Sequence, residues 1–345
     1  MRTLTVKAST EYNIHIENGL IDKIGKCTRE VTAAGKAFIV SDTNVYPLYG
    51  SRVKDSLIKE GFAVSEYIIP AGEASKTPEN MIKIVESCAE AGLTRSDLLV
   101  ALGGGVVGDI TGLSASLYQR GTDFIQIPTT LLAAVDSSVG GKTAVDLKAG
   151  KNLLGAFYQP IAVFCDPETL NTLTPRDFHD GCAEVIKYAV LKGGKLLELV
   201  KAGIKENSEE VIEICVVIKR DIVEADEFDR GERKLLNLGH TIGHAIEKSS
   251  NFSLPHGSAV AAGMCIIARA CLKKGICSTD FITSLESLCK VYDLPTASDI
   301  SADRLYTAAC SDKKREQDTL TLILPKNFGD CVMQKIQIAD LKEYI

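Results

Sequence analysis

The chain contains no tryptophan and no apolar stretch of the length that a membrane span requires. The longest uninterrupted apolar run in its second half, Ala259–Ala268, has about half of the ~20 residues needed, and the first residues lack the apolar segment of a secretory signal. Basic residues are too few for a nucleic-acid binder, since 39 Lys and Arg face 45 Asp and Glu and give a net charge of −6. We therefore expect a soluble, cytoplasmic protein with neither a membrane nor a nucleic acid as partner.

Paired cysteines are absent as well. The 11 cysteines are an odd number, none belongs to a C-x-x-C pair, and most stand in apolar stretches, as Cys215, Cys265 and Cys271 do. Buried free thiols in a reducing compartment explain this better than a disulfide framework. With 345 residues, of which 45% are hydrophobic and 24% charged, the chain suffices for one or two folded domains, which excludes a disordered or fibrous protein.

Short apolar runs alternate with helical patterns in the first half of the chain. The runs that predict strands are 37–41, 63–69, 97–102, 123–127 and 161–165. Thr77-Pro78 opens a helix over Glu79–Ala91, since proline at the start of a helix gives up no hydrogen bond. Strands that alternate with helices predict an α/β domain with a mostly parallel sheet and helices on both of its faces.

The pattern changes after residue 174. Apolar residues then recur at spacings of three and four, as in Val211–Val223 and Ala259–Leu272, and Thr174-Pro175 is typical of a helix start. Thr319–Leu324 is an exception and is typical of a short strand. Since no repeat or low-complexity linker divides the halves, we expect two domains, 1–174 and 175–345, of which the second is mainly α-helical.

The clearest indication of phosphate binding is a glycine-rich turn. Gly103, Gly105 and Gly108 form G-x-G-x-x-G directly after the run LLVAL and before a predicted helix. Glycines let a pyrophosphate approach the backbone, and the helix N-terminus offers N–H groups to it. Asp42, just after an earlier strand, is suited to hydrogen-bond a ribose. The alternative is a tight strand–helix turn that binds nothing.

A second glycine motif resembles an ATP-binding loop only superficially. Ser138–Thr143 reads SVGGKT, but Asp136 stands where a P-loop needs its first glycine. ATP binding by this loop is therefore excluded. Lys142, beside two glycines, is still able to contact a phosphate as a point charge.

Three of the five histidines cluster in one segment. His240 and His244, at i and i+4, share a helix face, and His256 precedes a helix whose N-terminus disfavours the imidazolium form. Glu184 is an apolar-flanked carboxylate one turn from Lys187. Two histidines and one carboxylate describe a catalytic zinc site with open positions. Spacing selects His240 and His244 first but leaves the choice of ligands open, and the alternative is a set of polar core histidines and a surface glutamate.

Several cations stand near glycines or near these motif residues: Lys151, Lys187, Lys219, Arg233 and the pair Lys313-Lys314. Each of them on its own is better explained as a solvated surface charge. They indicate an anionic substrate only if the fold brings them together.

Seven segments, in their order along the chain, resemble the 3-dehydroquinate synthases of the shikimate pathway, within the sugar-phosphate cyclase superfamily. They are PAGEASK (Pro70–Lys76), GGGVVGD (Gly103–Asp109), IPTTLLAAVDSSVGGKTAVD (Ile127–Asp146), GKNLLGAFYQP (Gly150–Pro160), GCAEVIKYAVL (Gly181–Leu191), NLGHTIGHAIE (Asn237–Glu247) and HGSAVAAGM (His256–Met264). The resemblance implies an N-terminal Rossmann-like α/β domain that binds NAD and a C-terminal helical domain that binds a metal and the substrate.

The resemblance also assigns residues. It implies that one divalent metal, zinc or cobalt, binds Glu184, His240 and His256, whereas His244 contacts the substrate. The implied NAD contacts are Asp42, Asn44, Gly72, Glu73, Lys76, Gly104, Gly105, Val106, Val107, Gly108, Asp109, Thr129, Thr130, Lys142, Lys151, Thr169, Leu170, Asn171 and Thr172. The implied substrate contacts are Asp136, Lys142, Lys187, Lys219, Arg233, Asn237, His244 and either Lys313 or Lys314, of which Lys314 is favoured. Arg120 is implied to reach the phosphate site of a neighbouring subunit, which implies a homodimer.

The implied reaction converts 3-deoxy-D-arabino-heptulosonate 7-phosphate into 3-dehydroquinate and phosphate. NAD oxidises a hydroxyl transiently, phosphate is eliminated, the hydride is returned, and an intramolecular aldol step closes the ring. Two alternatives are a 2-deoxy-scyllo-inosose synthase-like cyclase and a metal-dependent polyol dehydrogenase, which would release NADH. A non-catalytic NAD-binding protein with a structural metal is disfavoured, because the sequence has no cysteine cluster to complete a structural zinc site.

Overall fold

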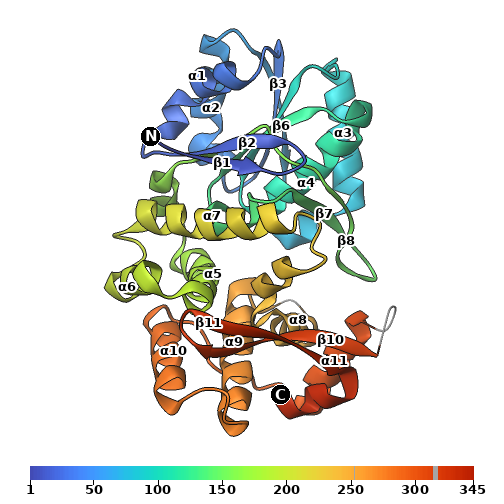
Figure 1. The fold of residues 1–345 in the computed structure, drawn as a ribbon. Coiled ribbons are helices and arrows are strands. Elements are labelled where there is room, and N and C mark those ends of the chain that lie inside the picture. Colours follow the sequence, from blue (N-terminus) through green and yellow to red (C-terminus); the bar gives the residue numbers. More distant parts are fainter. Residues whose placement is uncertain (252, 314–317) are drawn as a thin grey trace. The chain divides into compact units, whose positions relative to one another are not determined.

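The computed structural model describes residues 1–251, 253–313 and 318–345. Within them the chain forms two compact units, each of which is described by itself (Figure 1). The first unit comprises Met1–Leu173 and the segment Lys219–Phe228, and the second comprises Thr174–Ile218 and Asp229–Ile345. The expected domains have no such interruption, because contacts between segments so distant in sequence leave no local pattern.

A seven-stranded sheet is the centre of the first unit. Its strands are β1 (Arg2–Lys7), β2 (Glu11–Ile16), β3 (Lys36–Asp42), β4 (Ala63–Ile69), β5 (Leu98–Gly103), β6 (Asp123–Pro128) and β9 (Ala162–Cys165). They follow the order β1-β2-β9-β6-β5-β3-β4, and all neighbours are parallel except β1 and β2. The mostly parallel sheet is thus confirmed, and the β1–β2 hairpin at its edge is an addition to it.

Helices cover both faces of this sheet, as predicted (Figure 1). Ile39 and Val100 pack in one core with α1 (Ile24–Val31) and α2 (Ser51–Lys59). Their neighbours Phe38 and Leu99 pack in the other core with α3 (Pro78–Glu90) and α4 (Gly105–Leu117). Because successive side chains point to opposite faces and both faces are buried, these strands are continuously apolar in sequence.

The strand order reverses at β3. The chain continues from β3 to β4 on one side and then crosses to β5 on the other side. In such sheets a ligand binds in the crevice outside the carboxyl ends of the strands at the reversal. Asp42 ends β3 and the glycine-rich turn follows β5, so the fold brings both predicted nucleotide-binding features to this edge.

A two-stranded hairpin, β7 (Lys142–Leu147) and β8 (Gly150–Phe157), begins at the end of the second glycine motif. The sequence pattern did not predict these two strands. It packs on α4, where a Cβ on Gly112 would lie 2.4 Å from Thr143 Cγ2. Short 3-10 or π turns complete the connections along the chain: η1 (Leu20–Lys23), η2 (Tyr46–Gly50), η3 (Glu73–Ser75), η4 (Tyr118–Arg120), η5 (Ala133–Ser137), η6 (Pro167–Thr172), η7 (Glu232–Asn237) and η8 (Ile338–Tyr344).

Helices make up most of the second unit, as predicted. They are α5 (Pro175–Lys192), α6 (Gly194–Ala202), α7 (Ser208–Ala225), α8 (His240–Ser249), α9 (His256–Lys273), α10 (Thr279–Val291) and α11 (Ala302–Lys313), of which α7 enters the first unit at Lys219. The Thr174 hydroxyl accepts the Asp177 N–H at 3.1 Å and caps α5, which confirms the predicted helix start. The predicted strand at Thr319–Leu324 lies within β10 (Thr319–Asn327), which pairs with β11 (Asp330–Gln337).

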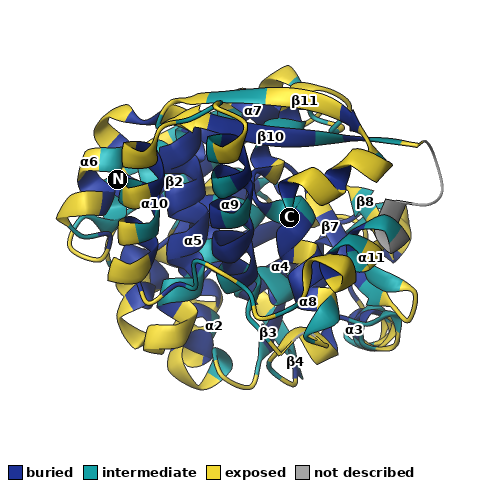
Figure 2. Cartoon of the chain, turned by 90° about the horizontal axis from the view of Figure 1, so that it is seen from below, coloured by how far each residue is buried: buried dark blue, intermediate teal, exposed yellow. Residues whose placement is uncertain are grey.

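Helix α9 is the buried centre of this unit, as Figure 2 shows in dark blue. Its apolar run Ala259–Ala268 is buried nearly throughout, so the run belongs to a protein core. Within the described residues, no helix has the length and apolarity that crossing a membrane requires. All 11 cysteines are free thiols, which confirms that prediction.

Candidate active site

Three helices of the second unit bring the predicted metal ligands together. Glu184 of α5 is fully buried, and its Oε1 lies 3.6 Å from Nε2 of His240 on α8 and 3.3 Å from Nε2 of His256 on α9. One donor atom from each residue lies within 4.8 Å of the other two. This geometry leaves room for one small cation among the three donors.

Close packing of α8 on α9 determines this geometry. A Cβ on Gly263 would lie 2.2 Å from Gly239 O, and one on Gly243 would lie 3.1 Å from Val260 Cα. The helices therefore run past each other in opposite directions, and the end of α8 meets the start of α9. The first turn of α9 is fixed further by Asp180, whose Oδ1 accepts the Ser258 N–H at 3.0 Å.

In each of the two predicted ligand histidines, Nδ1 contacts a hydrogen-bond acceptor of its own. His240 Nδ1 lies 3.1 Å from Leu238 O, and His256 Nδ1 lies 3.3 Å from Glu247 Oε2. Such acceptors bind the Nδ1–H group and leave Nε2 unprotonated for a metal. Both Nε2 atoms face Glu184, so the donor set fits a divalent ion that accepts two imidazoles and a carboxylate.

The two imidazoles differ in pKa in the absence of a metal. Burial lowers the pKa of His240 to about 3, so this ring is neutral at physiological pH. Burial also opposes the charged form of His256, but its hydrogen bonds to the carboxylates of Glu184 and Glu247 outweigh this effect and raise the pKa to about 10. The two carboxylates thus make this position favourable for positive charge, which is the electrostatic condition for binding a cation.

A second donor group shares His256. In the described chain, His244, Glu247 and His256 also place one donor atom each within 4.8 Å of one another. His244 is exposed, and Glu247 already accepts a hydrogen bond from His256. Spacing selected His240 and His244 first, and their ring centroids do lie 5.4 Å apart. The buried carboxylate of Glu184, however, contacts His240 and His256.

Two of the predicted cations are buried in this unit. Lys187 Nζ lies 2.5 Å from Glu184 Oε2, and both side chains are at most 1% exposed. Arg233, on η7, is 2% exposed and is the largest of the fully buried side chains. Surface solvation does not explain either residue, because a buried cation requires an anionic partner or ligand. Asn237 ends the same turn and is exposed.

The predicted NAD contacts of the first unit follow the carboxyl ends of five parallel strands. Asp42 and Asn44 come after β3, Gly72–Lys76 after β4, Gly104–Asp109 after β5, Thr129 and Thr130 after β6, and Thr169–Thr172 after β9. Because carboxyl ends of parallel strands meet at one edge, these residues form a single rim. Within the rim, Asp42 Oδ1 accepts the N–H groups of Asn44 and Val45 at 2.8 and 2.9 Å.

Two features of this rim fit a bound nucleotide. Helix α4 starts at the glycine turn without a side-chain cap on its first N–H groups. The Thr129 hydroxyl is buried and has no hydrogen-bond partner among the described residues, although the Thr129 N–H donates to Gly103 O at 3.0 Å. A buried hydroxyl with no protein partner is unfavourable unless a ligand or water supplies one.

A buried lysine connects the rim to the β7–β8 hairpin. Lys76 Nζ lies 2.5 Å from Asp109 Oδ2 and 2.6 Å from Asn152 Oδ1. Burial alone would lower the pKa of Lys76, but the carboxylate of Asp109 outweighs it and raises the pKa. A second ion pair also joins the rim to the hairpin, because Lys151 Nζ on β8 lies 3.5 Å from Glu73 Oε1. Lys142, at the start of β7, is exposed.

Lys219 and Asp136 meet in the first unit. Lys219 Nζ donates to Asp136 O at 2.6 Å and pairs with the Asp136 carboxylate, and the lysine side chain is 8% exposed. Arg120 lies elsewhere, beyond the far end of α4. A helix of 13 residues is about 20 Å long, so Arg120 is distant from the glycine turn of its own chain. Lys314 and the side chain of Lys313 lie outside the described residues.

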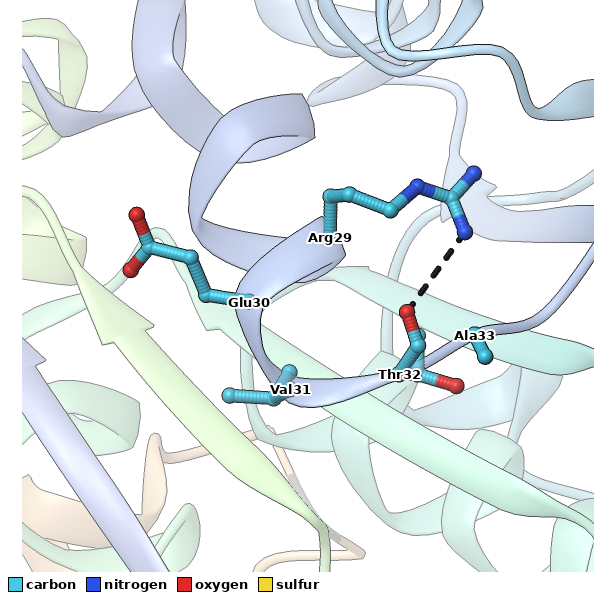
Figure 3. Close-up of a pocket in the computed structure, with 5 residues that line it drawn as sticks. All are labelled: Arg29, Glu30, Val31, Thr32 and Ala33. Atoms are coloured by element: carbon cyan, nitrogen blue, oxygen red, sulfur yellow. Dashed lines mark hydrogen bonds between the residues drawn. The ribbon is translucent and has the colours of Figure 1, made fainter.

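A shallow depression at the end of α1 has no relation to these sites. Arg29, Glu30, Val31, Thr32 and Ala33 line it, and Arg29 reaches Thr32 O at 3.5 Å (Figure 3). None of the predicted site residues lines it.

Sequence reasoning did not single out Glu247, Asn152 or Asp180. Glu247 lies seven residues after His240, two turns along the same helix, and this spacing could have identified it. Asp180 lies on α5 four residues before Glu184, which is one helical turn away. Asn152 left no such pattern, because it reaches Lys76 from a hairpin that the sequence did not predict.

Comparison with known families gives two matches along the chain. The model of the 3-dehydroquinate synthase N-terminal region matches residues 66–180, and that of the C-terminal region matches residues 181–315. The 3-dehydroquinate synthase of Clostridium acetobutylicum is 42% identical, over 100% of this chain and 99% of that protein. The 3-dehydroquinate synthase of Streptococcus pneumoniae is 41% identical, over 97% of this chain and 96% of that protein.

Solved structures are similar over the whole chain. A 2-deoxy-scyllo-inosose synthase complexed with carbaglucose-6-phosphate, NAD+ and Co2+ has a TM-score of 0.89 and 25% identity, covering 99% of this chain and 98% of that one. The 2-epi-5-epi-valiolone synthase of Streptomyces hygroscopicus with NAD+ and Zn2+ bound also has a TM-score of 0.89 and 25% identity, covering 100% and 98%. A probable glycerol dehydrogenase from Sinorhizobium meliloti is similar in fold alone, with a TM-score of 0.61 and 16% identity over 96% and 94%.

Proposed function

The chain belongs to the 3-dehydroquinate synthase family, and we propose that it converts 3-deoxy-D-arabino-heptulosonate 7-phosphate into 3-dehydroquinate and inorganic phosphate. The observation that carries this proposal is the convergence of Glu184, His240 and His256 beside the buried Lys187. The reaction has no net oxidation or reduction, because the substrate loses phosphate and closes a carbon ring without a change in overall oxidation state.

Two cofactors belong to this proposal. A divalent ion, zinc or cobalt, is held by Glu184, His240 and His256, and NAD lies along the rim of the parallel sheet. The NAD+ and the Co2+ or Zn2+ of the similar cyclases support both assignments. When bound, the metal supplies Lewis acidity to a substrate oxygen and NAD accepts and returns a hydride.

The side chains of the second unit bind and orient the substrate. Lys187 is buried, and an ammonium group at such a position stabilises negative charge on a substrate oxygen more strongly than it would in water. Arg233 offers a planar fork of donors and is assigned to the substrate carboxylate. His244 and Asn237 are exposed and are assigned to substrate contacts.

Further substrate contacts come from the first unit. Lys219 and Asp136, which hold each other, are assigned to the substrate, and Lys142 is assigned to both the substrate and NAD. Lys314 is assigned to the phosphate by resemblance alone.

A homodimer is also part of the proposal. Leu153, Leu154 and Phe157 on β8 and Leu147 on β7 are 39–57% exposed, so the hairpin presents several large apolar side chains. Arg120 lies far from the glycine turn of its own chain, as a residue that serves a neighbouring subunit does. Arg120→Ala and Lys219→Ala should each retain little turnover, and mixing them should restore activity in hybrid dimers, since one site then retains both residues. No recovery in demonstrably mixed dimers would place the action of Arg120 within its own chain.

One experiment tests the activity against its alternatives. Phosphate release is measured with the heptulosonate phosphate and, separately, with glucose 6-phosphate, the substrate class of an inosose synthase-like cyclase. We expect release from the first compound and no accumulation of NADH. Faster turnover of glucose 6-phosphate would favour the other cyclase, and NADH accumulation with a simple polyol would favour a dehydrogenase.

A further inference from the structure

The segment Lys219–Phe228 packs with the first unit although it lies far beyond that unit in sequence. It carries Lys219, whose Nζ donates to Asp136 O at 2.6 Å. The same carbonyl accepts the Val139 N–H at 3.0 Å. A lysine side chain has four rotatable bonds, so its position depends on how firmly the backbone beneath it is held.

Two glutamates at the end of this segment hold it to the turn between β1 and β2. Glu224 Oε1 accepts the Lys7 N–H at 2.7 Å. Glu227 accepts the Ser9 N–H at 2.8 Å with Oε2 and the Ser9 hydroxyl at 2.7 Å with Oε1. Gln159 Nε2 donates to Glu227 Oε1 as well, at 2.8 Å.

The location of these glutamates is unfavourable for the helix itself. The C-terminal end of a helix carries partial negative charge, which repels acidic side chains. Glu224 lies in the last turn of α7 and Glu227 two residues beyond its end. The backbone N–H groups of Lys7 and Ser9 offset this repulsion by donating hydrogen bonds to the two carboxylates. The contact with the hairpin, rather than the helix, therefore explains why glutamates stand at these positions.

The same hairpin also holds the partner of Lys219. The Tyr12 hydroxyl on β2 accepts the Gly140 N–H at 3.1 Å in a buried position, four residues after Asp136. Figure 1 shows the hairpin beside the C-terminal part of α7. Both members of the Lys219–Asp136 pair are therefore attached to one hairpin.

We infer that Glu227, supported by Glu224, is a positioning residue that acts through the β1–β2 hairpin to hold Lys219 in place for the substrate. This inference rests on the assignment of Lys219 to the substrate in the proposed function.

Chemical labelling tests the position of Lys219 without any turnover. The full-length protein is treated with an amine-acetylating reagent, and acetylation of Lys219 is followed by mass spectrometry. Glu227→Ala should increase the acetylation rate of Lys219 on the order of tenfold, because the ion pair and its burial then protect the amine less. Glu210→Ala, on the same helix, is the matched control and should leave the rate unchanged.

The conservative variant keeps the test decisive. Glu227→Gln retains an oxygen that accepts the Ser9 N–H, so its Lys219 acetylation rate should lie between wild type and Glu227→Ala. If Glu227→Ala does not fold, Glu227→Gln and Ser9→Ala, which removes one donor, must show the same increase to a smaller degree. An unchanged rate in folded variants overturns the inference.

A double-mutant cycle links the position to substrate binding. Glu227→Ala should raise KM for the heptulosonate phosphate on the order of tenfold with unchanged metal content, and Lys219→Ala should raise it further. The double variant should equal Lys219→Ala, because Glu227 has no effect once Lys219 is absent. Effects that multiply would show an independent structural role. A wild-type protein without turnover would reject the proposed function, whereas the labelling result would still decide the role of Glu227.

Discussion

The two units present their candidate sites in opposite ways. In the first unit, glycines and strand ends form a rim that offers backbone groups to the proposed nucleotide. In the second unit, a buried carboxylate and two half-buried imidazoles from three helices form the proposed metal site. Backbone groups remain when a side chain is replaced. Replacing a buried charged side chain, in contrast, leaves the charge of its partner uncompensated.

This difference predicts where single substitutions act. In the second unit, a substitution should remove a ligand or leave a charge such as Lys187 unpaired, and activity should fall before stability does. In the first unit, a substitution outside the residues assigned to the substrate should mainly disturb packing, and stability should fall first. The five predictions below test this contrast, from the largest expected effect to the smallest.

The metal ligands should show the largest effect. Glu184→Gln, His240→Ala and His256→Ala should each lose the metal, and turnover should fall roughly 10³-fold, which corresponds to about 4 kcal/mol of lost Lewis-acid stabilisation. Metal content is measured by elemental analysis beside the rate. His244→Ala is the control, since it should keep its metal and lose turnover. Full metal content in His256→Ala would sink the assignment.

Arg233 should come next. Arg233→Ala should lose about 2–5 kcal/mol of transition-state stabilisation, roughly 30- to 5,000-fold in kcat/KM for the heptulosonate phosphate, because it removes one side of a buried charge pair. Lys234→Ala, at the adjacent position, should change little. Near-wild-type activity of Arg233→Ala would overturn the carboxylate assignment and leave the metal site unaffected.

Glu247 tests whether the second unit depends on support around its ligands. Glu247→Ala should weaken metal binding about 10- to 100-fold, since the carboxylate orients His256 through Nδ1. Glu247→Gln should lose less, because the amide oxygen still accepts that hydrogen bond. Affinity is measured by titration with Co2+. A loss as complete as that of His256→Ala would make Glu247 a ligand, as in the second donor group.

Gly112 tests the packing of the first unit. A Cβ there would lie 2.4 Å from Thr143 Cγ2 and 3.1 Å from Phe124 Cζ, so Gly112→Ala should lower the free energy of unfolding by about 1–3 kcal/mol. Gly35→Ala is the matched control, because its nearest neighbour is Asp97 Oδ1 at 3.9 Å. Urea denaturation measures both. Equal stability of the two variants would contradict the close packing of β7 on α4.

Asp97 should show the smallest effect, and only in acid. Burial alone would raise the pKa of Asp97, but hydrogen bonds from Thr94 and Lys36 outweigh it and hold the pKa below its ordinary value. Its contribution to stability is therefore present above the unfolded pKa of about 3.9 and is lost as the pH falls through the folded pKa. Asp97→Asn should flatten the acid limb of the stability curve, measured by thermal unfolding from pH 6 to pH 2. An unchanged acid limb would exclude this contribution.

Local chemistry made several elements predictable. Strands β3, β5, β6 and β9 are largely apolar runs because both of their faces are buried, and Thr174-Pro175 starts a helix because threonine caps it and proline costs no hydrogen bond. The β1–β2 and β7–β8 hairpins were not predicted. Both lie outside the parallel core, where one exposed face weakens the apolar pattern.

The histidines show where local spacing fails. An i, i+4 pair is visible in the sequence, so spacing selects His240 and His244. His256 faces Glu184 only because small residues let α8 and α9 pack closely in opposite directions. The family resemblance, rather than spacing, predicted His256.

The sequence by itself determined the two classes of structure, the glycine turn at a strand end and the residue types able to bind a metal, since each depends on neighbours along the chain. Only the tertiary structure decided that Glu247 supports His256, that Lys76 joins Asp109 and Asn152, and that Lys219–Phe228 packs with the first unit. Most of these contacts join segments that lie tens of residues or more apart in the sequence. The contact between Glu247 and His256 joins two helices, α8 and α9. Their energy comes from burial and complementary charge, which exist only after the chain has folded.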